Sequence, residues 1–370
     1  MTLPSFRLLP LESWPINASF PLVIAGPCAA ETEEQVMETA LRLAKSGEIA
    51  LLRAGIWKPR TRPGSFQGMG DVALPWLVNA GKAAGIPTTT EVANAQHVEA
   101  ALNAGVDVLW IGARTTVNPF SVQEIADALK GVDIPVMVKN PINPDLELWI
   151  GAFERFAGAG ITRMLAMHRG FSGVQSGGFR NAPLWEIPIA LKAALPELPI
   201  LCDPSHITGD RKLLAGVAQK ALDLGMDGLM IETHPRPDEA WSDAAQQITP
   251  ETLFTLLDGL NLRNTNCVDP TVANELTLLR SHIDEVDEQV IRLLAKRMDL
   301  VREIGSYKKE NDITILQIER WKEIMRSRKA IGAALQLPEE FLTQYLELIH
   351  KSSIRLQGRL MNDNDGDIPW

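Results

Sequence analysis

The chain has 370 residues, 45% of them hydrophobic and 22% charged, and carries a formal net charge of −10. Its length suits two domains better than one, and its acidic balance argues against a nucleic-acid binder or a protein held on anionic membranes. Three cysteines are too few for a disulfide framework, the N-terminus lacks the pattern of a signal peptide, and no apolar stretch approaches the roughly 20 residues that span a bilayer. We therefore expect a cytoplasmic protein without nucleic-acid or membrane partners.

From about residue 20 to 258, short apolar runs alternate with amphipathic helical patterns. The runs show little polar alternation, as parallel strands buried on both faces do. They cover residues 21–26, 50–54, 86–90, 107–112, 134–140, 162–168, 198–203 and 228–233. Glycines typical of helix C-caps close many of the helical patterns, at Gly85, Gly105, Gly131, Gly160 and Gly225. Eight repeats in about 240 residues predict an α/β fold, a (β/α)8 TIM barrel, with a doubly wound open sheet as the alternative.

The pattern changes after residue 260, where the predicted barrel domain of residues 1–260 ends. Residues 261–270 are polar, contain Pro270, and indicate a linker. An all-α three-helix domain is expected over residues 271–360, with helices at about 271–309, 316–331 and 338–360, followed by a tail at 361–370. The first helix would run about 60 Å and carries an apolar stripe too long to be buried by its own domain.

Ionisable residues stand at the ends of the predicted strands, where TIM barrels carry their active sites. Cys28, His206 and Glu232, with Asp243 as a fourth candidate, come from strands that become neighbours in a closed barrel. Such a thiolate, imidazole and carboxylate set suits a divalent transition metal such as Mn, Fe, Co or Zn. A second set is cationic and predicts a phosphorylated substrate: Arg53, Lys58, Arg60, Arg114, Lys139 and Arg169. Each residue alone is more often structural or solvated, and only their joint placement favours a site.

Seven ordered motifs carry a family resemblance. They are GPCAAE at 26–31, RAGIWKPRT at 53–61, SFQG at 65–68, GAR at 112–114, PVMVK at 135–139, DPSH at 203–206 and IETHP at 231–235. This set resembles the metal-dependent 3-deoxy-D-arabino-heptulosonate-7-phosphate (DAHP) synthases, of the type that is similar to 3-deoxy-octulosonate-8-phosphate synthase. The resemblance implies condensation of phosphoenolpyruvate with erythrose 4-phosphate and release of phosphate.

The resemblance also implies roles for individual residues. It matches the metal ligands to Cys28, His206, Glu232 and Asp243, the phosphoenolpyruvate contacts to Lys58, Arg114, Lys139 and Arg169, and the sugar-phosphate contacts to Arg60 and Thr61. We expect Lys58 to transfer a proton, with a pKa lowered by neighbouring cations. The Pro59-Arg60 pair favours the four-carbon aldose over the octulosonate alternative, whose enzymes usually have Ala-Asn there. Arg62 and His168 depart from the common family residues.

The helical region carries a second resemblance, in Leu279-Arg280, Ile283-Asp284, Val286-Asp287, Leu293-Leu294, Arg297-Met298, Ile304-Gly305, Tyr307-Lys308-Lys309 and Glu319-Arg320. Over residues 271–358 the pattern is similar to the all-helical chorismate mutases. The resemblance places six residues in a chorismate pocket: Arg280, Arg297, Lys308, Arg320, Ser353 and Gln357. Arginines would clamp the two carboxylates, while Lys308 and Gln357 would donate to the ether oxygen. Gln317 and Trp321 stand where some family members have acidic residues.

Helix geometry separates Arg280 from the rest of this set. Arg297 and Lys308 are eleven residues apart and lie within about 20° of one face, whereas Arg280 lies roughly 100° away. A partner chain's Arg280 would therefore complete the pocket, and we expect a homodimer through this domain. Feedback on the barrel by chorismate or prephenate is also expected. The alternative is a helical module that serves dimerisation and ligand sensing without catalysis.

Overall fold

The computed structural model describes residues 6–58, 64, 66–173, 177–263 and 269–362. The chain divides into two compact units, Met1–Thr265 and Asn266–Trp370. Of the predicted linker and tail, residues 264–268 and 363–370 lie outside the described residues. In the described part of the chain, no helix has the length and apolar character needed to cross a membrane.

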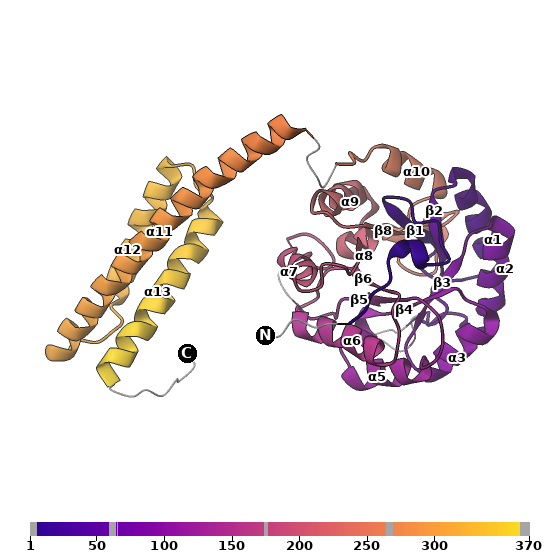
Figure 1. Cartoon of the computed structure of the whole chain (residues 1–370), viewed down its shortest axis with the longest axis horizontal. Coiled ribbons are helices and arrows are strands. Elements are labelled where there is room, and N and C mark those ends of the chain that lie inside the picture. Colours follow the sequence, from indigo (N-terminus) through magenta and orange to yellow (C-terminus); the bar gives the residue numbers. More distant parts are fainter. Residues whose placement is uncertain (1–5, 59–63, 65, 174–176, 264–268, 363–370) are drawn as a thin grey trace. The chain divides into compact units, whose positions relative to one another are not determined.

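The first unit contains a closed barrel of eight parallel strands in chain order (Figure 1). The strands are β1 (Leu22–Gly26), β2 (Ile49–Arg53), β3 (Thr88–Val92), β4 (Val108–Ile111), β5 (Val136–Lys139), β6 (Met164–His168), β7 (Ile200–Cys202) and β8 (Gly228–Glu232). Apart from Glu91, every strand residue is buried, which explains the near-absence of polar alternation in the sequence. The predicted TIM barrel is confirmed, and the open-sheet alternative is wrong because β1 pairs with β8.

Helices surround the strands in the order that the sequence predicts. They are α1 (Glu33–Leu43), α2 (Leu74–Ala84), α3 (Ala95–Ala104), α4 (Ala113–Thr116), α5 (Pro119–Ala128), α6 (Leu146–Gly158), α7 (Glu186–Ala194), α8 (Pro204–Thr208), α9 (Leu214–Asp223) and α10 (Pro250–Asp258). Short 3₁₀ helices cover Leu11–Ser13, Ala44–Ser46, Gly70–Ala73, Arg211–Leu213, Pro237–Glu239 and Ala244–Gln246. The five glycines expected at helix ends all adopt positive φ angles.

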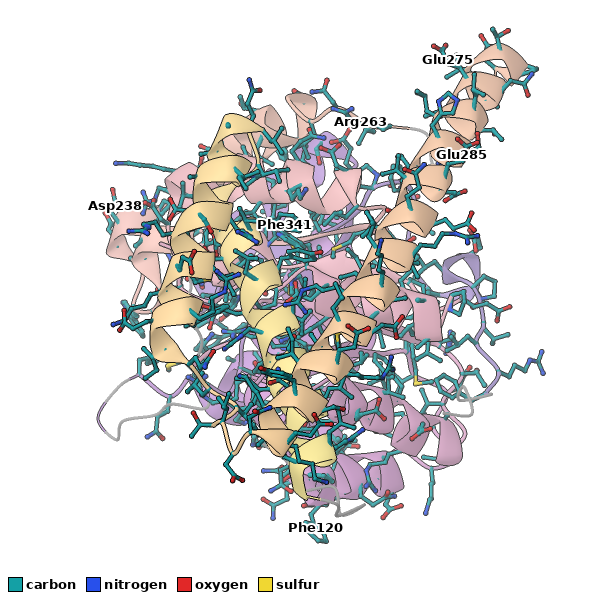
Figure 2. The ribbon with its side chains drawn as sticks, turned by 90° about the vertical axis from the view of Figure 1, so that its left-hand side faces the viewer. Phe120, Asp238, Arg263, Glu275, Glu285 and Phe341 are labelled. Atoms are coloured by element: carbon teal, nitrogen blue, oxygen red, sulfur yellow. The ribbon has the colours of Figure 1, made fainter. Side chains whose placement is uncertain are left out.

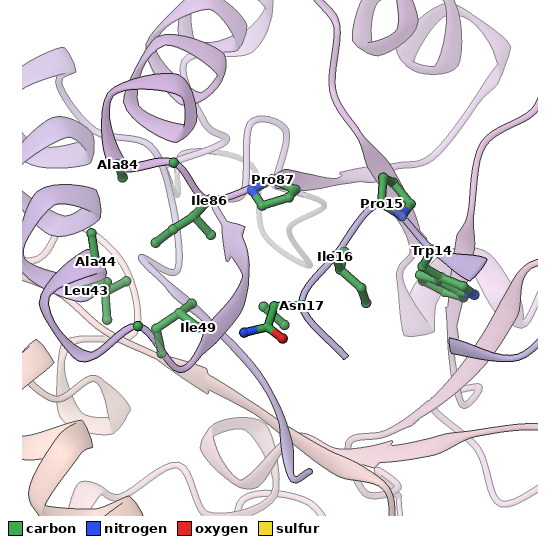
Figure 3. Close-up of a pocket in the computed structure, with 13 residues that line it drawn as sticks. Trp14, Pro15, Ile16, Asn17, Leu43, Ala44, Ile49, Ala84, Ile86 and Pro87 are labelled. Carbon is green, nitrogen blue, oxygen red and sulfur yellow. The ribbon is translucent and has the colours of Figure 1, made fainter. Parts of the chain in front are cut away.

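One end of the barrel is apolar. Trp14 packs with the residues that fill the barrel interior, among them Trp110, Met137 and Met230. Beside it, a cleft of about 520 Å³ lies between residues 14–17 and the segments that precede β2 and β3 (Figure 3). No charged residue lines this cleft among the residues that the structure describes. The ionisable groups lie instead at the opposite ends of the strands.

The second unit consists of α11 (Pro270–Glu310), α12 (Ile318–Ala334) and α13 (Glu339–Asn362), as predicted within a few residues. The Asp269 side chain caps α11 by accepting from the amide of Thr271. Both α11 and α12 contact α13, and the start of α11, near Glu275, extends beyond the other two helices (Figures 1 and 2). Apolar residues of its stripe are exposed, including Leu279 at 54%, Ile283 at 59% and Val286 at 56%.

Candidate active sites on the barrel and the helices

Cys28 and Lys58 meet at the mouth of the barrel. The Cys28 thiol follows β1 and is buried, 2.8 Å from Lys58 Nζ and 3.1 Å from Asp243 Oδ2. Lys58 Nζ also donates to the Cys28 carbonyl at 2.9 Å. This close approach requires Gly55, because a Cβ there would lie 2.5 Å from the Cys28 carbonyl oxygen and 2.9 Å from Lys58 Cδ. Burial, with the nearby Glu232 carboxylate, raises the pKa of Cys28 to about 12, so that the thiol keeps its proton at neutral pH.

Asp203 organises the end of β7. Its side chain caps α8 by accepting from the amide of His206, and its Oδ2 lies 2.7 Å from Lys139 Nζ and 2.8 Å from His206 Nδ1. Although burial opposes ionisation, His206 and Lys139 hold the pKa of Asp203 well below its usual range. Burial lowers the pKa of His206, which is therefore neutral. Its Nε2 lies 3.7 Å from Glu232 Oε1.

Glu232, at the end of β8, is fully buried and lies next to the Arg53 guanidinium and the Gln246 amide. Arg53 Nη2 lies 3.0 Å from Oε1, and Gln246 donates to Oε2 at 2.7 Å. Burial opposes its ionisation, but His206 and Arg53 outweigh that effect and lower the pKa of Glu232. Asp243 adopts a left-handed backbone with φ of 51° and accepts from Arg180 at 2.9 Å. Arg180 therefore ties Asp243 to the same cluster.

The four predicted metal ligands gather in this cluster. Among the described residues, no group of three or more His, Cys, Asp or Glu side chains is spaced to hold a metal ion as it stands. Protein partners hold the ligand atoms instead: Lys58 at Cys28, Arg53 at Glu232 and Arg180 at Asp243. The donor set fits a divalent transition metal, because it combines sulfur, imidazole and carboxylate groups. In addition, His206 Nδ1 and Glu232 Oε1 are buried without a hydrogen-bond partner among the described residues.

The cationic set lines a pocket of about 390 Å³ beside this cluster. Its lining includes the four cations assigned to phosphoenolpyruvate, Lys58, Arg114, Lys139 and Arg169, together with Arg180, His206 and Asp243. Burial lowers the pKa of Arg169 to about 10, which leaves its guanidinium charged at neutral pH. Arg53 does not line this pocket; it lies beneath, paired with Glu232 and 5.0 Å from the Trp110 ring centroid. Arg60, Thr61 and Arg62 lie outside the described residues.

At the barrel mouth, the expected lowering of the Lys58 pKa is wrong, and His168 is buried among aromatic rings. Burial lowers the pKa of Lys58, but its interactions with Cys28 and with the Glu232 carboxylate outweigh that effect, so the pKa is raised rather than lowered as expected. Arg53 is a neighbouring cation that does lower the pKa of Lys58, but its effect is smaller. His168 is fully buried and has aromatic neighbours in Phe171 and Trp185. Burial lowers the pKa of His168 to about 3, so this side chain stays neutral.

The sequence does not point to Arg180 and Gln246 as residues of this site. Asp203 is the last residue of the predicted strand 198–203, and its strand-end position marked it without giving it a role. Gln246 and Arg180 lie away from strand ends, in the loops after β8 and β6, and bind each other at 2.7 Å. No periodicity or strand-end position identifies residues of such loops.

On the helices, two of the six predicted pocket residues, Arg297 and Ser353, are in contact, and Lys308 and Gln357 are buried. Arg297 Nη1 donates to Ser353 Oγ at 2.8 Å, and Lys308 Nζ donates to the Ile315 carbonyl at 2.6 Å. Ser353 and Gln357 are buried on α13, and Gln357 Oε1 has no hydrogen-bond partner among the described residues. Burial lowers the pKa of Arg297. Helix α11 thus contributes two cations that are at least half-buried, and α13 two buried neutral polar groups.

The remaining two cations are not part of this group in one chain. Arg280 is exposed and lies seventeen residues before Arg297 on the same helix, about 25 Å along its axis. Arg320 is also exposed and pairs with Glu323 at 2.6 Å. Next to Arg320, the Trp321 ring stacks on His350, with 3.9 Å between ring centroids and 15° between planes.

Comparison with known proteins assigns each unit separately. Residues 18–264 match the DAHP synthetase I family, and residues 279–358 match chorismate mutase type II. A phospho-2-dehydro-3-deoxyheptonate aldolase from Thermotoga maritima is 31% identical over 254 residues, which cover 69% of this chain and 73% of that protein. The crystal structure of a phospho-2-dehydro-3-deoxyheptonate aldolase (DAHP synthase) from the same species matches with a TM-score of 0.61 and 30% identity, covering 69% of this chain and 72% of that one.

A second kind of relative matches the helices. A bifunctional chorismate mutase/prephenate dehydratase from Buchnera aphidicola is 34% identical over 88 residues, which are 24% of this chain and 23% of that protein. The chain therefore spans less than a quarter of that relative.

Proposed function

The chain belongs to the DAHP synthetase I family, carries a chorismate mutase domain at its C-terminal side, and on that premise we propose how its own residues perform the two reactions. It is a bifunctional enzyme, a transferase and an isomerase of the shikimate pathway. The synthase occupies residues 1–260 and the mutase residues 271–360, joined by a linker at 261–270. The need for a reduced Cys28 agrees with a cytoplasmic location.

The barrel condenses phosphoenolpyruvate with erythrose 4-phosphate and releases phosphate. The observation that carries this proposal is the pocket in which Arg114, Lys139 and Arg169 meet Lys58 beside the cysteine, histidine and carboxylate cluster. In an acidic chain, such a concentration of cations favours anionic ligands. Holding both reactants in one pocket lowers the entropic cost of bringing them together. Arg60 and Thr61 would bind the sugar phosphate.

Members of this family are generally metal-dependent. Cys28, His206, Glu232 and Asp243 would hold a divalent ion, Mn, Co, Fe or Zn, which when bound supplies Lewis-acid polarisation of the aldehyde. Because its pKa is raised, Lys58 stays protonated at neutral pH. Its ammonium group would donate a proton to the aldehyde oxygen as negative charge develops there. Asp203 keeps His206 in the tautomer whose Nε2 is unprotonated.

A substrate and metal test separates the alternatives. Consumption of phosphoenolpyruvate in the presence of erythrose 4-phosphate should stop when a chelator is added and return with Mn²⁺. Full activity in the chelator would contradict the metal proposal. Consumption with arabinose 5-phosphate instead of erythrose 4-phosphate would indicate an octulosonate synthase, since an eight-carbon acid needs a five-carbon aldose. No consumption with either sugar would leave a phosphate-binding protein without turnover.

The helical domain rearranges chorismate to prephenate. Arg297 binds one substrate carboxylate, while Lys308 and Gln357 donate to the ether oxygen as the breaking bond places charge on it. The buried position of Gln357 supports this, because its Nε2 amide can donate to a ligand there without competition from solvent. Chorismate consumption by the full chain tests it; no turnover would favour a sensing and dimerisation module.

Two copies associate through α11. The exposed stripe of Leu279, Ile283 and Val286 supplies an apolar surface, and the second copy's Arg280 would complete each pocket together with Arg320. Sedimentation at micromolar concentration should show a dimer, and a monomer would refute the proposal. Prephenate bound at the helices would then inhibit the barrel. Synthase kinetics that stay constant across a prephenate titration would remove this feedback.

A further inference from the structure

The aromatic pair of Trp321 and His350 joins α12 to α13 beside the mutase pocket. The two rings stack face to face, with 3.9 Å between their centroids and 15° between their planes. Both side chains are half-buried. Since the faces of the rings are used for packing, the edge of the imidazole remains available for hydrogen bonds in its plane. Among the described residues, none is hydrogen-bonded to either ring nitrogen of His350.

His350 lies on the pocket side of α13. His350, Ser353 and Gln357 follow one another at spacings of three and four residues, which places them on one helical face. Ser353 accepts from Arg297, and the Arg297 charge, after the effect of burial, lowers the pKa of His350. The imidazole is therefore neutral at physiological pH, and one of its nitrogens is a hydrogen-bond acceptor.

The mutase pocket must offer its substrate a hydrogen-bond acceptor as well as donors. Chorismate has a ring hydroxyl besides its two carboxylates and its ether oxygen. Gln317 is exposed and Trp321 has an indole, at positions where some chorismate mutases have acidic residues. Arg297 and Lys308 are donors only, Ser353 Oγ already accepts from Arg297, and Gln357 is assigned to the ether oxygen. His350 is therefore a further acceptor on this helical face.

We propose that His350, held in orientation by the stacked Trp321, accepts a hydrogen bond from the ring hydroxyl of chorismate, so that this aromatic pair determines specificity for the hydroxylated substrate. The inference rests on the mutase function proposed above. A site built to bind a hydroxyl discriminates against an analogue that lacks it, because the polar group of the site is then left unpaired. A planar imidazole fixed by stacking loses less entropy than a flexible carboxylate when it forms such a bond.

The test compares chorismate with an analogue that lacks the ring hydroxyl, in the full-length chain. His350→Phe preserves an aromatic ring against Trp321 and removes both nitrogens. We expect kcat/KM for chorismate to fall about 10- to 100-fold in this variant, while the value for the analogue stays unchanged. His350→Gln, which restores an acceptor, should recover part of the loss for chorismate. The adjacent exposed Lys351→Phe is the control and should behave as the wild type.

The outcomes are distinct. Equal losses for both substrates in His350→Phe would show a packing role and overturn the proposal, as would unchanged values for both. If the wild-type chain does not consume chorismate at all, the mutase function fails instead. Intrinsic fluorescence supplies a second readout. The part of the emission that Trp321→Phe removes should change when chorismate binds. An unchanged signal would show that the stacked pair does not contact the ligand and would overturn the proposal.

Discussion

The two candidate sites differ in how their charged groups are held. At the barrel mouth the charges are paired within the same unit: Lys139 and His206 with Asp203, Arg53 with Glu232, and Arg180 with Asp243. On the helices, Arg297 donates to a neutral hydroxyl, whereas Arg280 and Arg320 lie exposed. A barrel surrounds its strand ends with protein, and buried ions there require partners.

Three helices bury much less of their surface, and most of α11 is exposed in one chain. In the proposed dimer, their site would take its remaining charges from a second copy. A preorganised site thus lies within one folded unit, whereas the helical site would be completed by assembly. Each of the following variants should affect one site and leave the other unchanged. A variant that affects both would show that the two sites are not independent.

Removal of the thiol should have the largest effect. Cys28→Ala deletes a proposed metal ligand, and we expect synthase kcat to fall by about 10³ or more, with loss of bound metal. Mutase activity should not change. Cys202→Ala is the matched control, because Cys202 is equally buried but lies on β7 within the apolar core. Synthase rate and metal content per chain are the measurements. A Cys28→Ala chain with normal activity would exclude the thiol as a ligand.

Arg297→Ala should have the next largest effect, on the other site. Loss of a donor to developing or fixed negative charge typically costs about 10² to 10³ in rate. Chorismate turnover should fall by that factor while the synthase rate is retained. Arg292→Ala is the control, because Arg292 is exposed on the same helix and pairs only with Glu288 in the described part of the chain. An equal loss in the control would indicate a disturbed helix rather than a lost contact.

Asp203→Asn tests preorganisation within the barrel. The amide keeps the size of the side chain but loses the charge that holds Lys139 and the His206 tautomer. We expect a decrease of about 10- to 100-fold in synthase activity or metal affinity. The exposed Asp238→Asn serves as a control. If Asp203→Asn retained both properties, the pairing would be structural only.

The smallest effect is a pH dependence of metal binding. Because burial raises the pKa of Cys28 to about 12, the metal-free thiol is protonated between pH 6 and 9. The thiolate binds metal, so binding releases one proton and apparent affinity should tighten about tenfold per pH unit as pH rises. His206 is already neutral and adds no further slope at neutral pH. Competition with a chelating dye measures the slope, which should flatten in Cys28→Ser.

The sequence predicted the barrel well because its strands and helix ends have local causes. Buried parallel strands require continuous apolar runs, and positive φ angles at helix ends favour glycine. The set of strand-end ionisable residues follows from the same regularity, so Cys28, His206 and Glu232 were found without any coordinates. Arg180 and Gln246 were not found, because an irregular loop can place any of its residues at the mouth.

Electrostatic roles were harder to predict than positions. The pKa shift of Lys58 depends on distances to Cys28, Glu232 and Arg53, and residue order along the chain contains no such distances. Likewise, Arg53 has the position of a substrate-binding residue, yet its guanidinium turns toward Glu232. Strand position indicates which residues reach the mouth, and only packing decides which of them face the ligand.

Gly55 cannot be replaced by a larger residue without disturbing the barrel mouth. An alanine there would set its Cβ 2.5 Å from the Cys28 carbonyl oxygen and 2.9 Å from Lys58 Cδ, so the smallest substitution would displace two reacting groups together. Random mutagenesis for altered sugar specificity should therefore recover changes in the surrounding loops and none at position 55. Position 55 thus supports the site from outside the pocket lining, and new specificities must come from residues that line the pocket.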